Sequence, residues 1–432
     1  MRAITIVKYL FRFLSMWAWL GAINSLLAIA AYAQPQMPTM DNQSYPTRGN
    51  PTSAVASHDG RYVFVSVTNV DQPNFSGPDS AAGGRKDAVS GIQVFRRSQS
   101  LFHREQFRSI GFVRTGSTGA NGLVLLRGER TIAIGVGDEG VAFLDVRDLV
   151  RGRGSPRFAH QTTGAGTFDV VATPDGQFVF SSNEYGVISG QRGSVGIVAT
   201  QIDEKGRVDH PETIGQIPAG DIVPSLTLSP DGARLYVASE LVPAHDVPFI
   251  AGAGNPLLSK STCVQRQGAP PRSNGYISVI DTQKAIAFSK DSVVTRIASG
   301  CSPVRIAEAA DKSALFVSAR GDDAILAFSV PLLEGDPEHA LLRYIPAGGT
   351  APVGVRLFSN DKLLAVANSN RFADSIGDLA VIDLAPNTDR ARPLIMPAGH
   401  FPRNLSLSAD GSKLYLTNYT SRSLNVIKIG RR

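Results

Sequence analysis

Several residue patterns that mark well-known active sites are absent from this chain. Its seven histidines lie far apart, so no pair has the H-x-x-x-H spacing of a helical zinc site. Neither a G-x-S-x-G nucleophile elbow nor a phosphate-binding P-loop occurs. We therefore expect no metal and no cofactor, and any chemistry has to come from ordinary side chains.

Long runs of one charge are also absent. The 43 Lys and Arg residues outnumber the 37 Asp and Glu residues only slightly, and no basic cluster with interleaved aromatic residues occurs. Recognition of nucleic acid depends on such clusters. The composition therefore argues against a nucleic-acid partner.

Only one apolar run is long enough to cross a bilayer, and it lies at the N-terminus. Residues 1–33 have a basic start, the apolar segment FLSMWAWLGAINSLLAIAA, and a small-x-small pattern at Ala31–Ala33. We predict a signal peptide that is cleaved after Ala33, and retention as a membrane anchor is the alternative. Loss of its three basic residues lowers the formal net charge from +6 to +3. The mature chain would be periplasmic or secreted, with no membrane partner.

Internal repetition decides the architecture. Four stretches place a short apolar run on each side of an Asp-Gly turn: VASHDGRYVFVSVTN, VATPDGQFVFSSNE, LTLSPDGARLYVASE and LSLSADGSKLYLTN. Alternating or β-branched runs of four to seven residues are typical of strands, and Asp-Gly suits a tight hairpin turn. Degenerate versions of the pattern occur three more times, so the chain contains seven units.

Each unit continues into a Val-Ile-Asp-like third strand and a linking stretch that supplies a fourth strand. Such units cannot bury their own faces, and strand-only units with loops of varied length favour radial stacking. We predict an all-β fold, a single seven-bladed β-propeller of four-stranded antiparallel blades over residues 34–432, with a long insertion at about 240–274. The last unit lacks an outer strand, which residues 36–47 could supply to close the ring.

The repeat resembles the YVTN repeat of exported seven-bladed propellers. The namesake tetrapeptide corresponds to Tyr236–Ser239 and Tyr415–Asn418, and the likeness covers nearly all of residues 48–430. This resemblance implies a fold and export, but no particular activity. WD40, kelch and quinone-docking propellers are disfavoured, because their repeats contain tryptophan and both tryptophans of this chain lie within residues 1–33.

The last unit, GHFPRNLSLSADGSKLYLTNYTSRSLNVIKI, is also similar to the closing blade of lactonase-type propellers, which include 6-phosphogluconolactonase and the carboxymuconate-cyclising enzymes. The resemblance implies a Pro-Arg-His signature with a nearby Asn-Glu pair at the site. Here Pro402 and Arg403 are followed by Asn404, and the Asn-Glu pair, Asn183 and Glu184, lies in the third unit.

Strand order places the loops on two faces. The insertions lie almost entirely between second and third strands, so one face carries long loops and is here called the insertion face. The opposite face, the turn face, carries the tight turns. Cys263 lies in the insertion of the fourth unit and Cys301 in the link to the fifth, which places both on the insertion face. We predict a disulfide between them, because export leads to an oxidising compartment; two free thiols are the alternative.

Binding residues usually gather on long loops over a rigid scaffold, so we place the functional site on the insertion face, near the central channel. The candidate ligand-binding residues are Asp169, Glu240, Arg305, Arg356 and Asn404. The candidate catalytic residues are Glu184, His400 and Arg403. Arginines suit a carboxylate because a guanidinium offers a planar fork of donors. For each residue, the alternative is a structural role between blades.

Two hypotheses remain. In the first, a monomeric exported propeller binds a small anionic molecule or a protein partner on the insertion face. In the second, a lactonase-like hydrolase acts on a small anionic lactone, with Glu184 or His400 activating water and arginines holding the carboxylate. The split Pro-Arg-His signature favours the first hypothesis. Arg320-Gly321-Asp322 is interpreted as a coincidental loop triplet.

Overall fold

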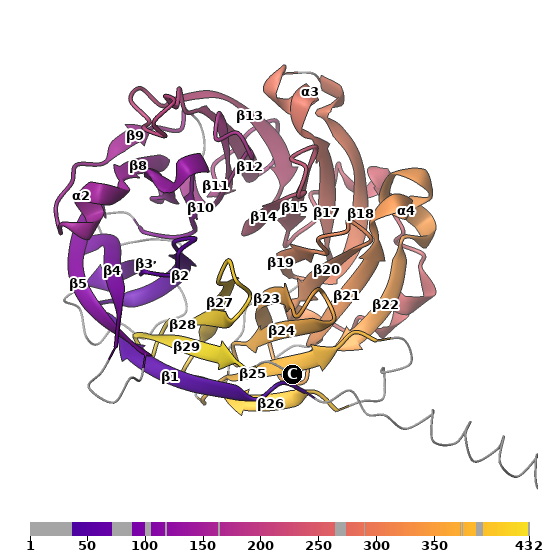
Figure 1. The fold of residues 1–432 in the computed structure, drawn as a ribbon. Coiled ribbons are helices and arrows are strands. Elements are labelled where there is room, and N and C mark those ends of the chain that lie inside the picture. Colours follow the sequence, from indigo (N-terminus) through magenta and orange to yellow (C-terminus); the bar gives the residue numbers. More distant parts are fainter. Residues whose placement is uncertain are drawn as a thin grey trace, which may run out of the picture. The chain divides into compact units, whose positions relative to one another are not determined.

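The computed structural model describes residues 37–70, 89–99, 105–116, 119–162, 165–263, 274–288, 290–371, 373, 375–385 and 392–430. Within residues 39–432, the strands form seven sheets arranged as propeller blades around a central axis (Figure 1). The predicted signal peptide lies outside the described residues. None of the helices in the described part of the chain has the length and apolar character needed to span a membrane.

Each blade has its first strand innermost and runs outward in antiparallel order. Blade 1 consists of β2 (Asn50–Ala56), β3 (Tyr62–Val70), β4 (Val89–Gln99) and β5 (Glu105–Gly116). Blade 2 consists of β6 (Leu123–Leu125), β7 (Thr131–Gly135), β8 (Val141–Asp145) and β9 (Arg157–Ala159). Blade 3 consists of β10 (Ala165–Ala172), β11 (Phe178–Tyr185), β12 (Gly193–Ala199) and β13 (Glu212–Gly220).

The remaining blades follow the same order, and blade 4 has one extra strand. Blade 4 consists of β14 (Ser225–Leu228), β15 (Arg234–Ser239), β17 (Asn274–Asp281), β18 (Val293–Cys301) and the short β16 (Ile250–Ala251). Blade 5 consists of β19 (Pro303–Glu308), β20 (Ala314–Ala319), β21 (Ala324–Ser329) and β22 (Leu341–Pro346). Blade 6 consists of β23 (Pro352–Phe358), β24 (Leu363–Asn368), β25 (Asp378–Asp383) and β26 (Leu394–Pro397).

Blade 7 is built from both ends of the chain. Its first three strands are β27 (Pro402–Leu407), β28 (Lys413–Asn418) and β29 (Ser423–Ile429). The outer strand is β1 (Met40–Pro46), which pairs antiparallel with β29 from Met40 opposite Ile429 to Pro46 opposite Ser423. The predicted ring closure by the N-terminal segment is therefore confirmed.

The turn face is capped by short elements. Three α-helices follow the third strands of blades 2, 4 and 5: α2 (Val146–Val150), α3 (Thr282–Ile286) and α4 (Val330–Gly335). The Asp-Gly turns behave as the sequence predicts. In blade 4, the Ser229 hydroxyl and the Ala233 N–H both donate to Asp231 Oδ1, at 2.6 and 3.1 Å, and Gly232 adopts a φ of 73°. Asp231 is thus a turn residue.

The hydrophobic core consists of clusters that lie between neighbouring blades. Phe64, Ile92 and Val94 of blade 1 pack with Ile132 and Ile134 of blade 2, and all five side chains are fully buried. The same kind of cluster fills the space between blades 2 and 3, 3 and 4, 4 and 5, 5 and 6, and 7 and 1. Each blade is therefore stabilised by its neighbours.

The insertion of blade 4 does more than extend the insertion face. Its β16 pairs in parallel with the outer strand β18, where Ile250 lies opposite Arg296. Beyond β16, the Gly252 N–H donates to Glu338 Oε2 at 3.0 Å, and Leu257 packs against the core between blades 4 and 5. The insertion thus covers part of the outer edge of its own blade, which would otherwise expose unpaired backbone groups, and then contacts blade 5.

Cys263 and Cys301 form the predicted disulfide, with their Cα atoms 5.2 Å apart. Cys301 ends β18 and is fully buried, whereas Cys263 lies at the end of the described part of the insertion. The bond closes a loop of 38 residues within blade 4, because β18 is a strand of that blade. It therefore fastens the insertion to the ring.

Replacement of both cysteines by serine should lower the free energy of unfolding by about 2–4 kcal/mol, because the unfolded chain regains the entropy of a long closed loop. Denaturant unfolding of the double variant and the wild type would measure the difference. Thiol titration of the denatured, unreduced wild-type protein should find no free thiol. Two thiols per chain would contradict the bond.

Candidate functional site

The second strands bring one side chain per blade to the insertion face. Glu184 lies in β11, while Glu240, Arg320 and Tyr419 directly follow β15, β20 and β28. All four occupy the same place in the repeat. In each blade, pairing between the second and third strands ends at one residue of the second strand, and the side chain in question belongs to the next residue. The repeat therefore delivers them to equivalent places around the channel.

The first strands deliver a second set of side chains through β-bulges. The pairing registers of β10, β19 and β27 shift at or beside Asp169, Arg305 and Arg403. After the bulge, a hydroxyl group of the second strand accepts the displaced N–H: Asp169 donates to Ser182 Oγ at 2.9 Å, and Arg305 to Ser318 Oγ at 3.0 Å. The same shift occurs in β2 and β23, so the bulge belongs to the repeat, and in blades 3, 5 and 7 it presents a charged residue.

These two sets form what we call the arginine–carboxylate cluster: Asp169, Glu184, Glu240, Arg305, Arg320 and Arg403. Electrostatic interactions link Glu184 to Glu240 and to all three arginines, and link Asp169 to Arg305 and Arg403. Glu184 and Arg403 are only 7% and 3% exposed. The cluster is therefore a buried network of charges contributed by blades 3, 4, 5 and 7.

Burial raises the pKa values of two carboxyl groups of the cluster, Glu184 and Asp169. Burial, followed by repulsion from Glu240, raises the pKa of Glu184 to about 7, although the three arginines oppose the shift. Burial also raises the pKa of Asp169, whose Oδ2 accepts a hydrogen bond from Ser225 Oγ at 3.1 Å. Glu184 is thus able to gain or lose a proton near neutral pH.

The arginines are unequally paired. Arg320 Nη2 lies 2.5 Å from Glu240 Oε2, and both side chains are 12% exposed, so this is a largely buried ion pair. Arg305 Nη1 donates to the carbonyl oxygens of Pro224 and Val304, both at 2.8 Å. The Nε atoms of Arg305 and Arg320 are buried without a hydrogen-bond partner. The cluster therefore retains donors that its own residues do not satisfy.

Arg403 is surrounded by aromatic rings. Its guanidinium carbon lies 4.8 Å from the ring centre of Phe168, 4.9 Å from that of Tyr419 and 5.9 Å from that of Phe401. Its Nη1 is buried and has no hydrogen-bond partner. Among the described residues, no ion pair joins Arg403 to a carboxylate. Burial lowers the pKa of Arg403, but a guanidinium keeps its charge at neutral pH.

Three candidates from the sequence lie outside the cluster. The exposed His400 makes its hydrogen bonds through its backbone, with its N–H donating to Ser421 Oγ at 2.6 Å. Asn404 Oδ1 accepts from Ser53 Oγ at 3.3 Å, at the boundary of blades 7 and 1. Arg356 is the fifth residue of β23 and lines a cavity on the turn face, so its predicted position on the insertion face is wrong.

Sequence reasoning missed Arg320, Phe168 and Tyr419. Arg320 belongs to a triplet that we interpreted as coincidental, yet alignment of the repeats places it at the same position as Glu184 and Glu240. Tyr419 would have emerged from the same alignment. The sequence does not indicate the role of Phe168. Its ring contacts Arg403 because the bulge between Thr167 and Asp169 changes the direction of its side chain.

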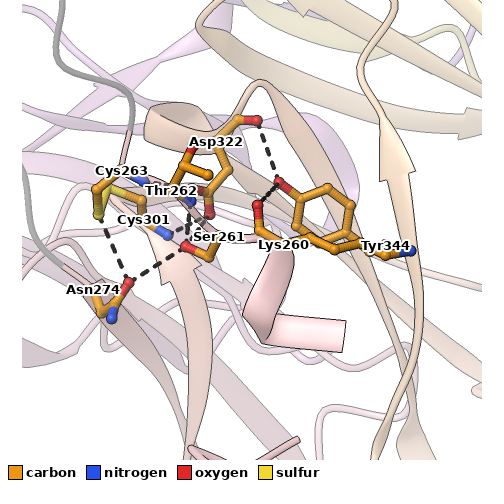
Figure 2. Close-up of a disulfide and its surroundings, with 8 residues drawn as sticks. All are labelled: Lys260, Ser261, Thr262, Cys263, Asn274, Cys301, Asp322 and Tyr344. Carbon is orange, nitrogen blue, oxygen red and sulfur yellow. Dashed lines mark hydrogen bonds between the residues drawn. A yellow bond between two sulfur atoms is a disulfide. The ribbon is translucent and has the colours of Figure 1, made fainter. Parts of the chain in front are cut away.

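The rest of that triplet anchors the disulfide (Figure 2). The Asp322 carboxylate accepts hydrogen bonds from the N–H groups of Cys263 and Cys301, at 3.2 and 2.8 Å, and from Ser261 Oγ. Arg320 and Asp322 are the ends of one short 3₁₀-helix, η6 (Arg320–Asp322). The triplet therefore links the disulfide to the cluster.

The two sulfur atoms lie near the Asp322 carboxylate, but they are bonded to each other and offer no thiolate to a metal.

Comparisons with known proteins define the fold alone. No protein-family model and no curated protein matches the chain. Solved structures that resemble it include Kuenenia stuttgartiensis hydrazine synthase, with a TM-score of 0.57 and 14% identity over 92% of this chain and 98% of that one. A chain of the mitotic checkpoint complex has a TM-score of 0.55 and 11% identity over 93% and 95% of the two chains. The protein is a seven-bladed β-propeller, and such distant likeness says nothing further about its activity.

The raised pKa of Glu184 leads to a prediction about stability and pH. A carboxyl group whose pKa is higher in the folded chain stabilises it below pH 4.5, and this contribution disappears as the pH rises through about 7. Between pH 5 and 8, Glu184 should remove about 2 kcal/mol from the free energy of unfolding. Glu184→Gln should therefore lose less stability than the wild type over this range in denaturant unfolding.

Glu308, whose pKa is also raised to about 7, is present in both proteins, so its contribution cancels. Parallel pH profiles would contradict the assignment.

Proposed function

We propose that this chain is an exported propeller of the YVTN-repeat type and that its arginine–carboxylate cluster binds a small anionic molecule. The tetrapeptides Tyr236–Ser239 and Tyr415–Asn418 support the family proposal, and both lie in second strands of the ring. The disulfide supports export, because such bonds persist in oxidising compartments. The proposed location is the periplasm or the exterior of the cell.

The binding proposal rests on the buried guanidinium of Arg403, whose Nη1 has no hydrogen-bond partner and which forms no ion pair with a carboxylate among the described residues. A buried charge without a partner is costly, and such a group is retained most readily where an incoming molecule completes its interactions. Arg305 and Arg320 add further unsatisfied donors nearby. A carboxylate accepts the parallel hydrogen bonds that guanidinium groups offer. A small mono- or dicarboxylate therefore fits the cluster best.

Isothermal titration with muconate and gluconate provides the test. We expect the wild type to bind at least one of them, and Arg403→Met should weaken binding by about tenfold or more, since a hydrogen bond to a charged group contributes about 1.5–3 kcal/mol. Arg108→Met, which removes an exposed arginine of β5, is the matched control and should bind like the wild type. Equal weakening in both variants, or no weakening in either, would refute a specific role for Arg403.

A lactonase-like hydrolase is the second candidate, and the pKa of Glu184 favours it. A carboxyl group with a pKa of about 7 can act as a general base at neutral pH, and nearby guanidinium groups could stabilise the anion that forms during lactone opening. His400 is a weaker base candidate, because no contact joins its ring to the cluster among the described residues.

Hydrolysis of 6-phosphogluconolactone and muconolactone, both anionic lactones, followed by pH-stat titration, separates the two candidates. If the hydrolase proposal holds, Glu184→Gln should lower kcat by about a hundredfold or more while product binding persists. Arg403→Met should lower turnover and binding together, and Arg108→Met should change neither. Absence of turnover in the wild type would eliminate the hydrolase candidate and leave the binding proposal intact.

A further inference from the structure

The turn face carries a cavity that lies outside the arginine–carboxylate cluster. It has a volume of about 660 Å³ and is lined by the first strands and turns of blades 4 to 7, including Thr227, Leu228, Glu308, Arg356, Leu357 and Leu407. Small-molecule sites commonly have volumes of about 300–1,000 Å³ and a largely apolar lining with a few polar groups. The cavity has the size of a binding site, and its lining combines apolar side chains with charged ones.

Arg356 is the basic residue in the lining of this cavity. Its side chain extends from β23 and is accessible. Within the described part of the chain it forms no hydrogen bond and no ion pair. The charge that acts on it is Asp361, whose Oδ2 already accepts the Ala310 N–H at 2.6 Å. The guanidinium therefore presents its donors to the cavity.

Glu308, an acidic residue in the lining of the same cavity, offers a hydrogen-bond acceptor. Its Oε1 accepts a hydrogen bond from Tyr236 Oη at 3.3 Å, whereas its Oε2 is buried without a partner. A buried acceptor without a donor is costly. No ion pair joins Glu308 to Arg356 among the described residues, although both line the cavity. One cavity thus holds an unused donor and an unused acceptor that do not satisfy each other.

The turn between β23 and β24 is strained where it lines the cavity. Ser359, Asn360 and Asp361 adopt consecutive positive φ values of 55°, 55° and 60°. The equivalent turns of blades 1, 3, 4 and 7 confine positive φ to a glycine. Left-handed backbone costs roughly 1–2 kcal/mol per residue, less for Asn and Asp. Such strain is concentrated at functional sites.

The charges of the lining indicate the class of ligand. Three acidic residues, Glu308, Asp361 and Asp410, line the cavity together with Arg356, so a simple anion would meet repulsion. A ligand with one carboxylate and one ammonium group would satisfy Arg356 and the unpartnered oxygen of Glu308 together. Because no ion pair joins these two groups among the described residues, the ligand has to reach both of them, and the volume of about 660 Å³ leaves room for a peptide of two or three residues. Leu228, Leu357 and Leu407 suit apolar side chains.

We propose that the turn-face cavity binds a zwitterionic peptide of two or three apolar residues, whose carboxylate pairs with Arg356 and whose amino group donates to Glu308. This site is independent of the function proposed for the insertion face.

Isothermal titration with the dipeptide leucyl-leucine tests the proposal on the whole chain. N-acetyl-leucyl-leucine removes the amino charge, and leucyl-leucinamide removes the carboxylate. The wild type should bind the free dipeptide at least about tenfold more tightly than either blocked form, because each charged hydrogen bond contributes about that factor. The blocked peptides test the proposal in wild-type protein, so it does not depend on a variant that folds.

The variants should then separate the two ends of the peptide. Arg356→Met should abolish the preference for a free carboxylate and keep the preference for a free amine, whereas Glu308→Gln should do the reverse. Arg108→Met should keep both preferences. Equal affinity for the acetylated and free dipeptides would leave only an anion site, equal affinity for the amide would leave only a cation site, and absence of binding at millimolar concentration would refute a peptide site. Each of these three results overturns the proposal.

Discussion

The antiparallel pairing of β1 with β29 is the constraint on which the ring depends. No blade can bury its own faces, so every core cluster needs a neighbour on each side, and an open ring would leave blades 7 and 1 exposed to water. The two ends of the chain meet in blade 7 and complete it. Ionic contacts add to this junction, since Glu105 of blade 1 lies 3.4 Å from Lys413 and 3.7 Å from Lys428 of blade 7. The position of each channel-lining residue follows from this closed geometry.

The closed ring gives the channel two chemically different ends. On the insertion face, strand ends and bulges bring arginines and carboxylates together, and Arg403 lies among aromatic rings with no ion pair to a carboxylate in the described part of the chain. On the turn face, Arg356 and Glu308 line a cavity without pairing. Both ends follow from the same repeat, because the first strand contributes its early residues to one face and its late residues to the other. One fold can thus present two sites with different selectivity.

The fold could be predicted from the sequence, because turns such as Ser229-Pro230-Asp231-Gly232 recur and strand alternation is a local property. The disulfide and most of the cluster could also be predicted, since strand order decides which loops share a face. The position of Arg356 could not, because a side chain near the middle of a short strand belongs to either face until the register is known. The bulges could not be predicted from the sequence either, although the bulge beside Asp169 brings Phe168 into contact with Arg403. Neither feature has a local sequence signature.

The helix η6 has an evolutionary consequence through its middle residue. A side chain at Gly321 would place its Cβ 2.5 Å from Cys301 Sγ and 2.9 Å from Cys301 Cβ, which no real contact tolerates. The flanking residues Arg320 and Asp322 contact the cluster and the disulfide loop. Any larger residue at this position would force the Cys301 side chain or its backbone to move. In related sequences, Gly321 should therefore be kept wherever Cys301 is kept.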